Sequence, residues 1–206
     1  DGLLKWAPHN LLTYSEDFTN AAWWLFDAGD TRTPDAGVSP DGTTNALLFA
    51  PDSTTNVHVL RQAFTFSSDV TYTLSAFIKS AGRRYCQIAA GGSVLGTPSY
   101  DYRRGVFDLQ SGAVVSEPTD GTASIQDFGG GWYLCSVIIT IPSGGSSNFD
   151  ICHANPATPT SNTITDGNGT DGIYVWGAHL YRSDLGGMAN NPDRGDSYVP
   201  TTTTAV

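Results

Sequence analysis

The chain has 206 residues, a formal net charge of −10 and only 15% charged residues, with 23 glycines and 11 prolines. Phosphate groups are bound by clustered Lys and Arg, so the acidic balance argues against a nucleic-acid partner and against docking on an anionic membrane. The length is sufficient for one buried core, and the many turn residues favour a single all-β domain over a helical one.

The first residues are predicted to form an extended arm. Pro8 interrupts any strand ladder, so residues 1–9 are expected to lead into the domain without joining a sheet. Leu3, Leu4 and Trp6 are apolar residues in a segment that has no core of its own. We therefore expect these three side chains to contact a neighbouring subunit or domain.

Short strands separated by turn residues are predicted through the rest of the chain. A first strand is expected over residues 10–14, and the Asp-, Gly- and Pro-rich residues 27–42 predict a long loop with short edge strands. Residues 72–79 alternate between polar and apolar for most of their length, as a half-buried strand does. The longest apolar run, residues 132–141, is expected to be a central strand.

The clearest hairpin signal is the Ser111-Gly112 turn, which separates an apolar segment over residues 104–109 from another over residues 113–115. Strands that recur roughly every 8–12 residues between turn residues are typical of an antiparallel sandwich. The predicted organisation is a single β-sandwich over residues 10–200, followed by a Thr-rich tail over residues 201–206.

The three cysteines do not form a recognisable framework. Cys86, Cys135 and Cys152 cannot all pair within one chain, and their spacing matches no zinc site. Each lies in an apolar, strand-like run, which predicts that they are small buried hydrophobic residues. A single disulfide between two of them is the alternative.

Signals for catalysis are weak. The chain lacks the Gly-x-Ser-x-Gly elbow that often carries a hydrolase serine. The histidines lie in the predicted arm or strands without a partnered nucleophile: His9, His58, His153 and His179. No pattern pairs two carboxylates as a glycosidase requires. We therefore predict that the protein is not an enzyme.

Residues 166–172, Asp-Gly-Asn-Gly-Thr-Asp-Gly, allow two interpretations. The oxygen-rich side chains resemble a cation-binding loop, but the spacing and the terminal Glu of an EF-hand are missing. A turn built from Gly, Asn and Asp is the favoured interpretation.

Aromatic residues are the strongest candidates for a binding function. Sugars present apolar C–H faces that stack on exposed aromatic rings, while Asp, Asn and Arg bond to their hydroxyls. Trp132 and Trp176, in the middle of apolar strands, are expected in the core. The predicted glycan-binding residues are Trp23, Tyr85, Tyr100, Asp101, Tyr102 and Arg103.

Six motifs occur in a fixed order along the chain. They are Asn10-Leu-Leu-Thr-Tyr-Ser-Glu-Asp-Phe18 before Trp23, Ser39 to Phe49, Thr71-Tyr-Thr-Leu-Ser-Ala-Phe-Ile-Lys79, Phe107 to Gly112, Gly131 to Ser136, and Ile173 to Ala178. As a series they resemble the carbohydrate-binding-like modules of bacteriophage tail and virion proteins, which are similar to xylanase- and cellulase-associated binding modules.

The resemblance implies a fold, a role and a set of partners. The fold is an antiparallel β-sandwich of the jelly-roll type, concanavalin- or galactose-binding-like. The role is a non-enzymatic virion protein, a tail-fibre, tail or decoration module, that folds in the host cytoplasm and presents a glycan-binding surface to the host. The expected partners are other virion proteins, further copies of the chain and host surface polysaccharide. The alternatives are a purely structural decoration or baseplate component and a polysaccharide depolymerase.

Enzyme-associated members of that group often hold a structural calcium ion. Glu16 matches the acidic residue after the first strand, and Asp41 and Thr43 match the following loop. The last strand carries Trp176-Gly177 where an Asp ligand would fall. No cofactor is therefore predicted, with a calcium ion at Glu16, Asp41 and Thr43 as the alternative.

Overall fold

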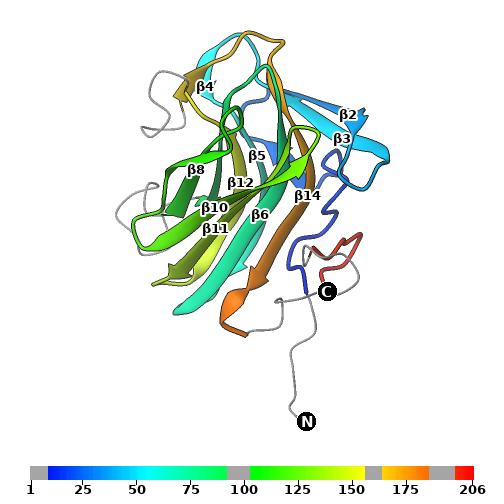
Figure 1. Ribbon diagram of the computed structural model, residues 1–206. Helices are drawn as coiled ribbons and strands as arrows, with labels where there is room; N and C mark the ends of the chain where they lie inside the picture. Colours follow the sequence, from blue (N-terminus) through cyan, green and yellow to red (C-terminus); the bar gives the residue numbers. More distant parts are fainter. Residues whose placement is uncertain (1–8, 92–102, 156–163, 186–197) are drawn as a thin grey trace.

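The computed structural model describes residues 9–91, 103–155, 164–185 and 198–206. The described chain is an antiparallel β-sandwich of the jelly-roll type, as predicted, with two six-stranded sheets and a short two-stranded ribbon (Figure 1). Leu3, Leu4 and Trp6 of the predicted arm lie outside the described residues.

The first sheet, called sheet A here, has the strand order β1-β5-β12-β7-β8-β9. Its strands are β1 (Trp23–Leu25), β5 (Val59–Phe66), β12 (Gly145–His153), β7 (Tyr85–Gly91), β8 (Arg104–Asp108) and β9 (Ala113–Ser116). The β8–β9 hairpin confirms the predicted turn at Ser111-Gly112.

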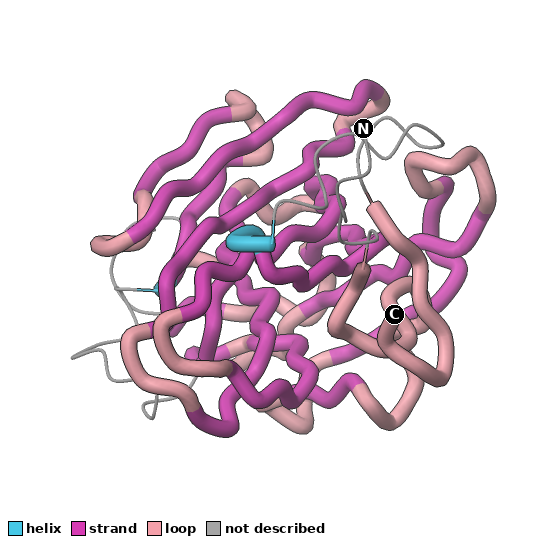
Figure 2. Tube along the Cα trace, turned by 90° about the horizontal axis from the view of Figure 1, so that it is seen from below, coloured by secondary structure: helices cyan, strands magenta, loops and turns pink. Residues whose placement is uncertain are grey.

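The second sheet, sheet B, has the order β10-β11-β6-β14-β3-β2. Its strands are β10 (Gly121–Gly129), β11 (Trp132–Ile141), β6 (Val70–Ala81), β14 (Gly172–Arg182), β3 (Thr44–Ala50) and β2 (Thr31–Val38). The ribbon pairs β4 (Thr55–Val57) with β13 (Ile164–Asp166), and the 3-10 helix η2 (Ser183–Leu185) follows β14. Strands dominate the view from below (Figure 2). No described helix is long and apolar enough to span a membrane.

The predicted central strand, β11, lies beside β6 along its whole length, from Trp132 opposite Lys79 to Ile141 opposite Val70. Alternate residues of these strands face the other sheet because successive side chains of a strand point to opposite faces. The sandwich core lies between the two sheets.

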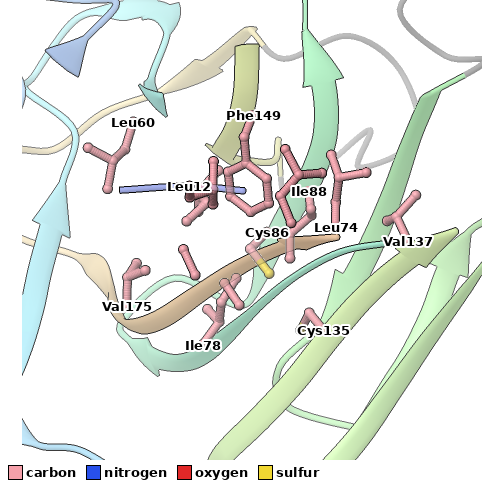
Figure 3. Packing of buried hydrophobic residues seen from close by; sticks show 14 of the residues in the cluster. Leu12, Leu60, Leu74, Ile78, Cys86, Ile88, Cys135, Val137, Phe149 and Val175 are labelled. Atoms are coloured by element: carbon pink, nitrogen blue, oxygen red, sulfur yellow. The ribbon is translucent and has the colours of Figure 1, made fainter. Parts of the chain in front are cut away.

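Figure 3 shows this core, where Leu74 and Val137 from sheet B meet Ile88 and Phe149 from sheet A. All of them are fully buried. All three cysteines are buried, as predicted for small hydrophobic residues, and none of them forms a disulfide. Burial raises the pKa of the Cys135 thiol, which keeps it protonated at neutral pH.

The start and the end of the described chain are joined, which corrects two predictions. Residues 10–14 do not form a strand, and residues 201–206 are not a separate tail. Instead, Asn10 exchanges backbone hydrogen bonds of 2.8 and 3.0 Å with Val206, and the Tyr14 amide donates to the Thr202 carbonyl. Both segments lie side by side in Figure 1.

The buried amide of Asn10 fixes this junction. Its Nδ2 donates to the carbonyls of Ala178 and Val199, at 3.0 and 2.8 Å, and its Oδ1 accepts from the amides of Leu12 and Leu180. A buried amide with both ends satisfied contributes specificity as well as stability.

Candidate functional site

The structure overturns the predicted role of Trp23. Its side chain is fully buried, and the indole Nε1 donates to the Tyr14 carbonyl at 3.0 Å. The ring packs between Phe18 and Phe149, with centroid distances of 4.8 and 6.0 Å. No ring face remains for a sugar, so Trp23 belongs to the core.

The other predicted glycan-binding residues are dispersed. Tyr100, Asp101 and Tyr102 lie outside the described residues. Arg103, also predicted to bind glycan, is only 2% exposed and so offers a sugar little surface. Tyr85 is half-buried at the start of β7.

Tyr85 lines a pocket of about 290 Å³ together with polar residues of the loop before β14. The guanidinium of Arg84 lies 4.9 Å from the Tyr85 ring centroid and covers one ring face. Arg84 also binds Asp108 through two hydrogen bonds of 2.9 and 2.7 Å, which hold the pKa of that carboxyl far below its ordinary value. Tyr85 therefore offers a sugar one face at most.

Among the described residues, two exposed aromatic rings lie at β1 and directly after it, on the edge of sheet A. Trp24 is 41% exposed and Phe26 is 52% exposed. The Arg61 guanidinium lies 5.1 Å from the Trp24 ring centroid and 5.0 Å from that of Phe26. We call Trp24, Phe26 and Arg61 the Trp24 platform.

Strand alternation produces this arrangement. Trp23 points into the core, so Trp24 points outward, and Trp24 lies opposite Arg61 in the β1–β5 register. The Phe26 amide donates to the Val59 carbonyl at 2.9 Å, which places Phe26 one repeat further along the same outer face. The platform is therefore built on paired strands.

Arg61 is held in place by a buried acid. Its Nη2 donates to Asp150 Oδ2 at 2.7 Å, and the side chains of Arg61 and Asp150 are 12% and 0% exposed. A Cβ at Gly91 would overlap the Asp150 carboxylate, so glycine is required at this point of β7. Arg61 Nε is buried and has no hydrogen-bond partner among the described residues. The platform thus combines two apolar rings with a fixed guanidinium that is 12% exposed.

The residues predicted to hold calcium make hydrogen bonds within the protein. Asp41 Oδ1 accepts hydrogen bonds from Ser39 Oγ, Thr43 N and Thr43 Oγ1, at 2.6, 2.9 and 2.8 Å, and so closes its own turn. Glu16 Oε1 accepts from the Tyr198 hydroxyl at 3.1 Å. One oxygen of each carboxylate is therefore already engaged by a donor within the protein.

The loop over residues 166–172 is a turn, as favoured. Asn168 Oδ1 accepts hydrogen bonds from the amides of Thr170 and Asp171, at 3.1 and 2.8 Å. The Asn168 amide group donates to Asp171 Oδ2 at 2.7 Å. The side-chain oxygens of Asn168 and Asp171 are turned toward their own loop and stabilise it.

A larger pocket of about 690 Å³ lies where the two ends of the described chain meet the edge of sheet B. Tyr14 and Asp35 line it, and both have positive φ angles, 49° and 52°, that non-glycine residues rarely adopt. Glu16 and Asp17 add negative charge to its wall. It lacks the pair of exposed rings that distinguishes the Trp24 platform.

No protein-family model matches the chain, and no curated protein matches it. Solved structures show a weak likeness, among them the following three. A carbohydrate-binding module described as CBM4 has a TM-score of 0.48 and 14% identity, over 84% of this chain and 99% of that chain. The CBM22-1–GH10 modules of Clostridium thermocellum xylanase 10B, complexed with xylohexaose, have a TM-score of 0.46 and 14% identity, over 87% and 29%. The enzymatically active domain of bacteriophage CBA120 tailspike protein 4 has a TM-score of 0.41 and 14% identity, over 84% and 21%.

Proposed function

We propose that the protein is a non-enzymatic glycan-binding module whose sugar-binding surface is the Trp24 platform. The observation that carries this proposal is the exposed ring pair Trp24 and Phe26 beside Arg61. A pyranose stacks its apolar face on a ring, and a fixed guanidinium donates to its hydroxyls. Because Asp150 already orients Arg61, little side-chain entropy is lost when the sugar binds.

We further propose that the module is displayed on a bacteriophage particle and contacts a host surface polysaccharide. The support for this context is the ordered series of sequence motifs from Asn10 to Ala178. An exposed platform binds a sugar weakly, and many copies on one particle raise the avidity. Other virion proteins and further copies of the chain are the partners that such display requires.

A purely structural virion role is the competing function. Its support is the same exposed apolar surface, since Trp24 and Phe26 on an edge strand also suit a contact with another subunit. In that case the rings become buried on assembly and no sugar binds to them.

Binding to host cells and to their extracted surface polysaccharide tests the proposal. The native chain is compared with the double variant Trp24→Ala/Phe26→Ala and with Ile138→Ala. Ile138 is a matched control because it is 40% exposed on β11 of the other sheet. We expect saturable binding that the double variant weakens at least about tenfold and the control leaves unchanged.

Three results would contradict the proposal. Absence of binding by a folded, assembled protein would favour the structural role. Unchanged binding by the double variant would show that the glycan-binding site is not the Trp24 platform. Release of soluble fragments from the polysaccharide would instead identify a depolymerase.

A further inference from the structure

A second group of side chains with binding chemistry lies at the β4 end of the sandwich, in the loops that join β1 to β2 and β3 to β5 (Figure 1). Asp27, Asp52 and His58 each offer one ligand atom, and these atoms all lie within 4.8 Å of one another. Asp27 and Asp52 are half-buried, and His58 is fully buried.

The hydrogen bonds of His58 require either a second proton on its ring or a cation bound to it. Its Nδ1 lies 2.6 Å from Asp30 Oδ1, and its Nε2 lies 3.2 Å from the Thr54 carbonyl oxygen. Both neighbours are acceptors when Asp30 is ionised, but a neutral imidazole carries only one N–H. If Nδ1–H donates to Asp30, the lone pair of Nε2 faces a carbonyl oxygen with nothing between them.

The buried carboxylate beside His58 strengthens this argument. Asp30 is 6% exposed, and its Oδ2 has no hydrogen-bond partner among the described residues. Asp30 Oδ1 also accepts from the Asp52 amide at 3.1 Å, which ties the acid to the cluster. Three carboxylates therefore surround one imidazole, and a positive charge at this point would offset them.

We propose that Asp27, Asp52 and His58 bind a divalent cation of the zinc class, with the Thr54 carbonyl as a fourth ligand. Two ligands that each lie about 2.1 Å from a metal are about 3–3.4 Å apart at right-angled or tetrahedral geometry. The 3.2 Å between His58 Nε2 and the Thr54 oxygen falls in that range. The ligand atoms of Asp27, Asp52 and His58 lie within 4.8 Å of one another, so the acids would draw closer around the ion. Asp30 is the acid that holds the ring of a ligating histidine through its other nitrogen.

The remaining contacts orient the two acids. Asp52 Oδ1 accepts from Thr54 N and Oγ1 at 2.8 and 2.6 Å, which leaves Oδ2 for the metal. Asp27 accepts one hydrogen bond at each oxygen, from the Gly29 amide to Oδ1 at 3.0 Å and from Asn56 Nδ2 to Oδ2 at 2.5 Å. A metal would therefore bind a remaining lone pair of one of these oxygens. An imidazole among the ligands favours Zn²⁺ over Ca²⁺, which prefers oxygen ligands alone.

Calorimetric titration of the chelator-treated protein with Zn²⁺, and separately with Ca²⁺, tests the site without any sugar. The variants are Asp27→Asn and Asp52→Asn, which keep the side-chain shape and remove one charge. Asp120→Asn is the matched control, because Asp120 is exposed beside β10, at the opposite edge of sheet B from β2. We expect one equivalent of Zn²⁺ to bind, at least about tenfold more weakly in each variant and unchanged in the control.

Nitrogen-15 resonances of the His58 ring distinguish the metal from a second proton. With Zn²⁺ bound, only Nδ1 should carry hydrogen. The proposal is overturned if Zn²⁺ does not bind at millimolar concentration, if both ring nitrogens stay protonated, if Ca²⁺ binds more tightly than Zn²⁺, or if both variants bind like the native chain. None of these outcomes bears on glycan binding at the Trp24 platform.

Discussion

The outer faces of the two sheets both carry large aromatic side chains. These side chains are buried on sheet B and exposed on the edge of sheet A. On sheet B, Phe77, Trp132, Trp176 and Tyr198 form a cluster that is at most 5% exposed. On the edge of sheet A, Trp24 is 41% exposed. The number of rings is therefore a poor guide to a binding surface.

The difference arises from what lies over each face. The Tyr198 ring, from the C-terminal segment, packs on Trp176 at 5.2 Å and on Phe77 at 6.1 Å between centroids. The group that packs on Trp24 is the guanidinium of Arg61, which leaves much of the indole in contact with solvent. An aromatic cluster under a covering segment stabilises the fold, whereas an uncovered ring beside a fixed charge is available to a ligand.

The largest loss of stability is expected when a residue of the buried aromatic cluster on sheet B is truncated. Trp176→Ala should lower the free energy of unfolding by about 3–5 kcal/mol, because it leaves a cavity in a buried aromatic group. Trp176→Phe should cost much less, since the indole Nε1 has no hydrogen-bond partner among the described residues. Urea unfolding measures both, and a Trp24→Ala variant that is equally destabilised would contradict the contrast between the two faces.

The second largest loss of stability is expected when the Arg61–Asp150 pair beside Trp24 is broken. Arg61→Leu should destabilise the protein by about 3 kcal/mol, because it removes the guanidinium that bonds to the fully buried Asp150 carboxylate. Arg182→Leu is the matched control, since the Arg182–Asp184 pair is largely solvent-accessible and should contribute little. Equal urea midpoints for the two variants would show that Asp150 does not depend on Arg61.

Lowering the pH should reduce the stability of the protein through His179, which lies on the outer face of sheet B. Burial lowers the pKa of His179 to about 4, and the ring lies 5.7 Å from that of Tyr198. The unfolded chain, with an ordinary pKa of about 6.5, takes up the proton first as the pH falls. Stability is therefore full above about pH 6.5 and falls until about pH 4, by about 3 kcal/mol in all. Urea unfolding of His179→Gln across this range should show a smaller loss; an identical loss would exclude His179 as the cause.

The smallest expected effect concerns the hydroxyl that anchors Tyr198. Its oxygen lies 2.8 Å from Ser15 Oγ and donates to Glu16. Tyr198→Phe should cost about 1 kcal/mol while the ring continues to cover Trp176. Thermal unfolding beside Tyr133→Phe, whose hydroxyl bonds to none of the described residues, measures this difference. A cost no larger than that of the control would mean that ring packing alone holds the segment.

The sequence was sufficient for the parts of the fold that depend on local pattern. Alternation and apolar length predicted β6 and β11, and the turn residues predicted the β8–β9 hairpin. The junction of residues 10–15 with residues 201–206 depends on hydrogen bonds across almost the whole chain, which no local pattern encodes.

The sequence analysis selected Trp23 as a glycan-binding residue, whereas the exposed ring belongs to its neighbour Trp24. In the pair Trp23-Trp24, strand alternation requires one ring to face outward, but the phase depends on the register with β5. Arg61 was not predicted as a site residue, because its role depends on the cross-strand contact with Asp150. The strand periodicity indicates that either Trp23 or Trp24 is exposed. The pairing of β1 with β5 is needed to show that it is Trp24.

The most direct test of the account is to follow the indole N–H resonances by NMR while host polysaccharide fragments are titrated into the protein. Trp24 is exposed, whereas Trp23, Trp132 and Trp176 are buried. We predict a saturable shift of the Trp24 signal while the signals of the three buried tryptophans stay in place. Binding that shifts Trp132 or Trp176 and leaves Trp24 unchanged would contradict the Trp24 platform as the glycan-binding surface.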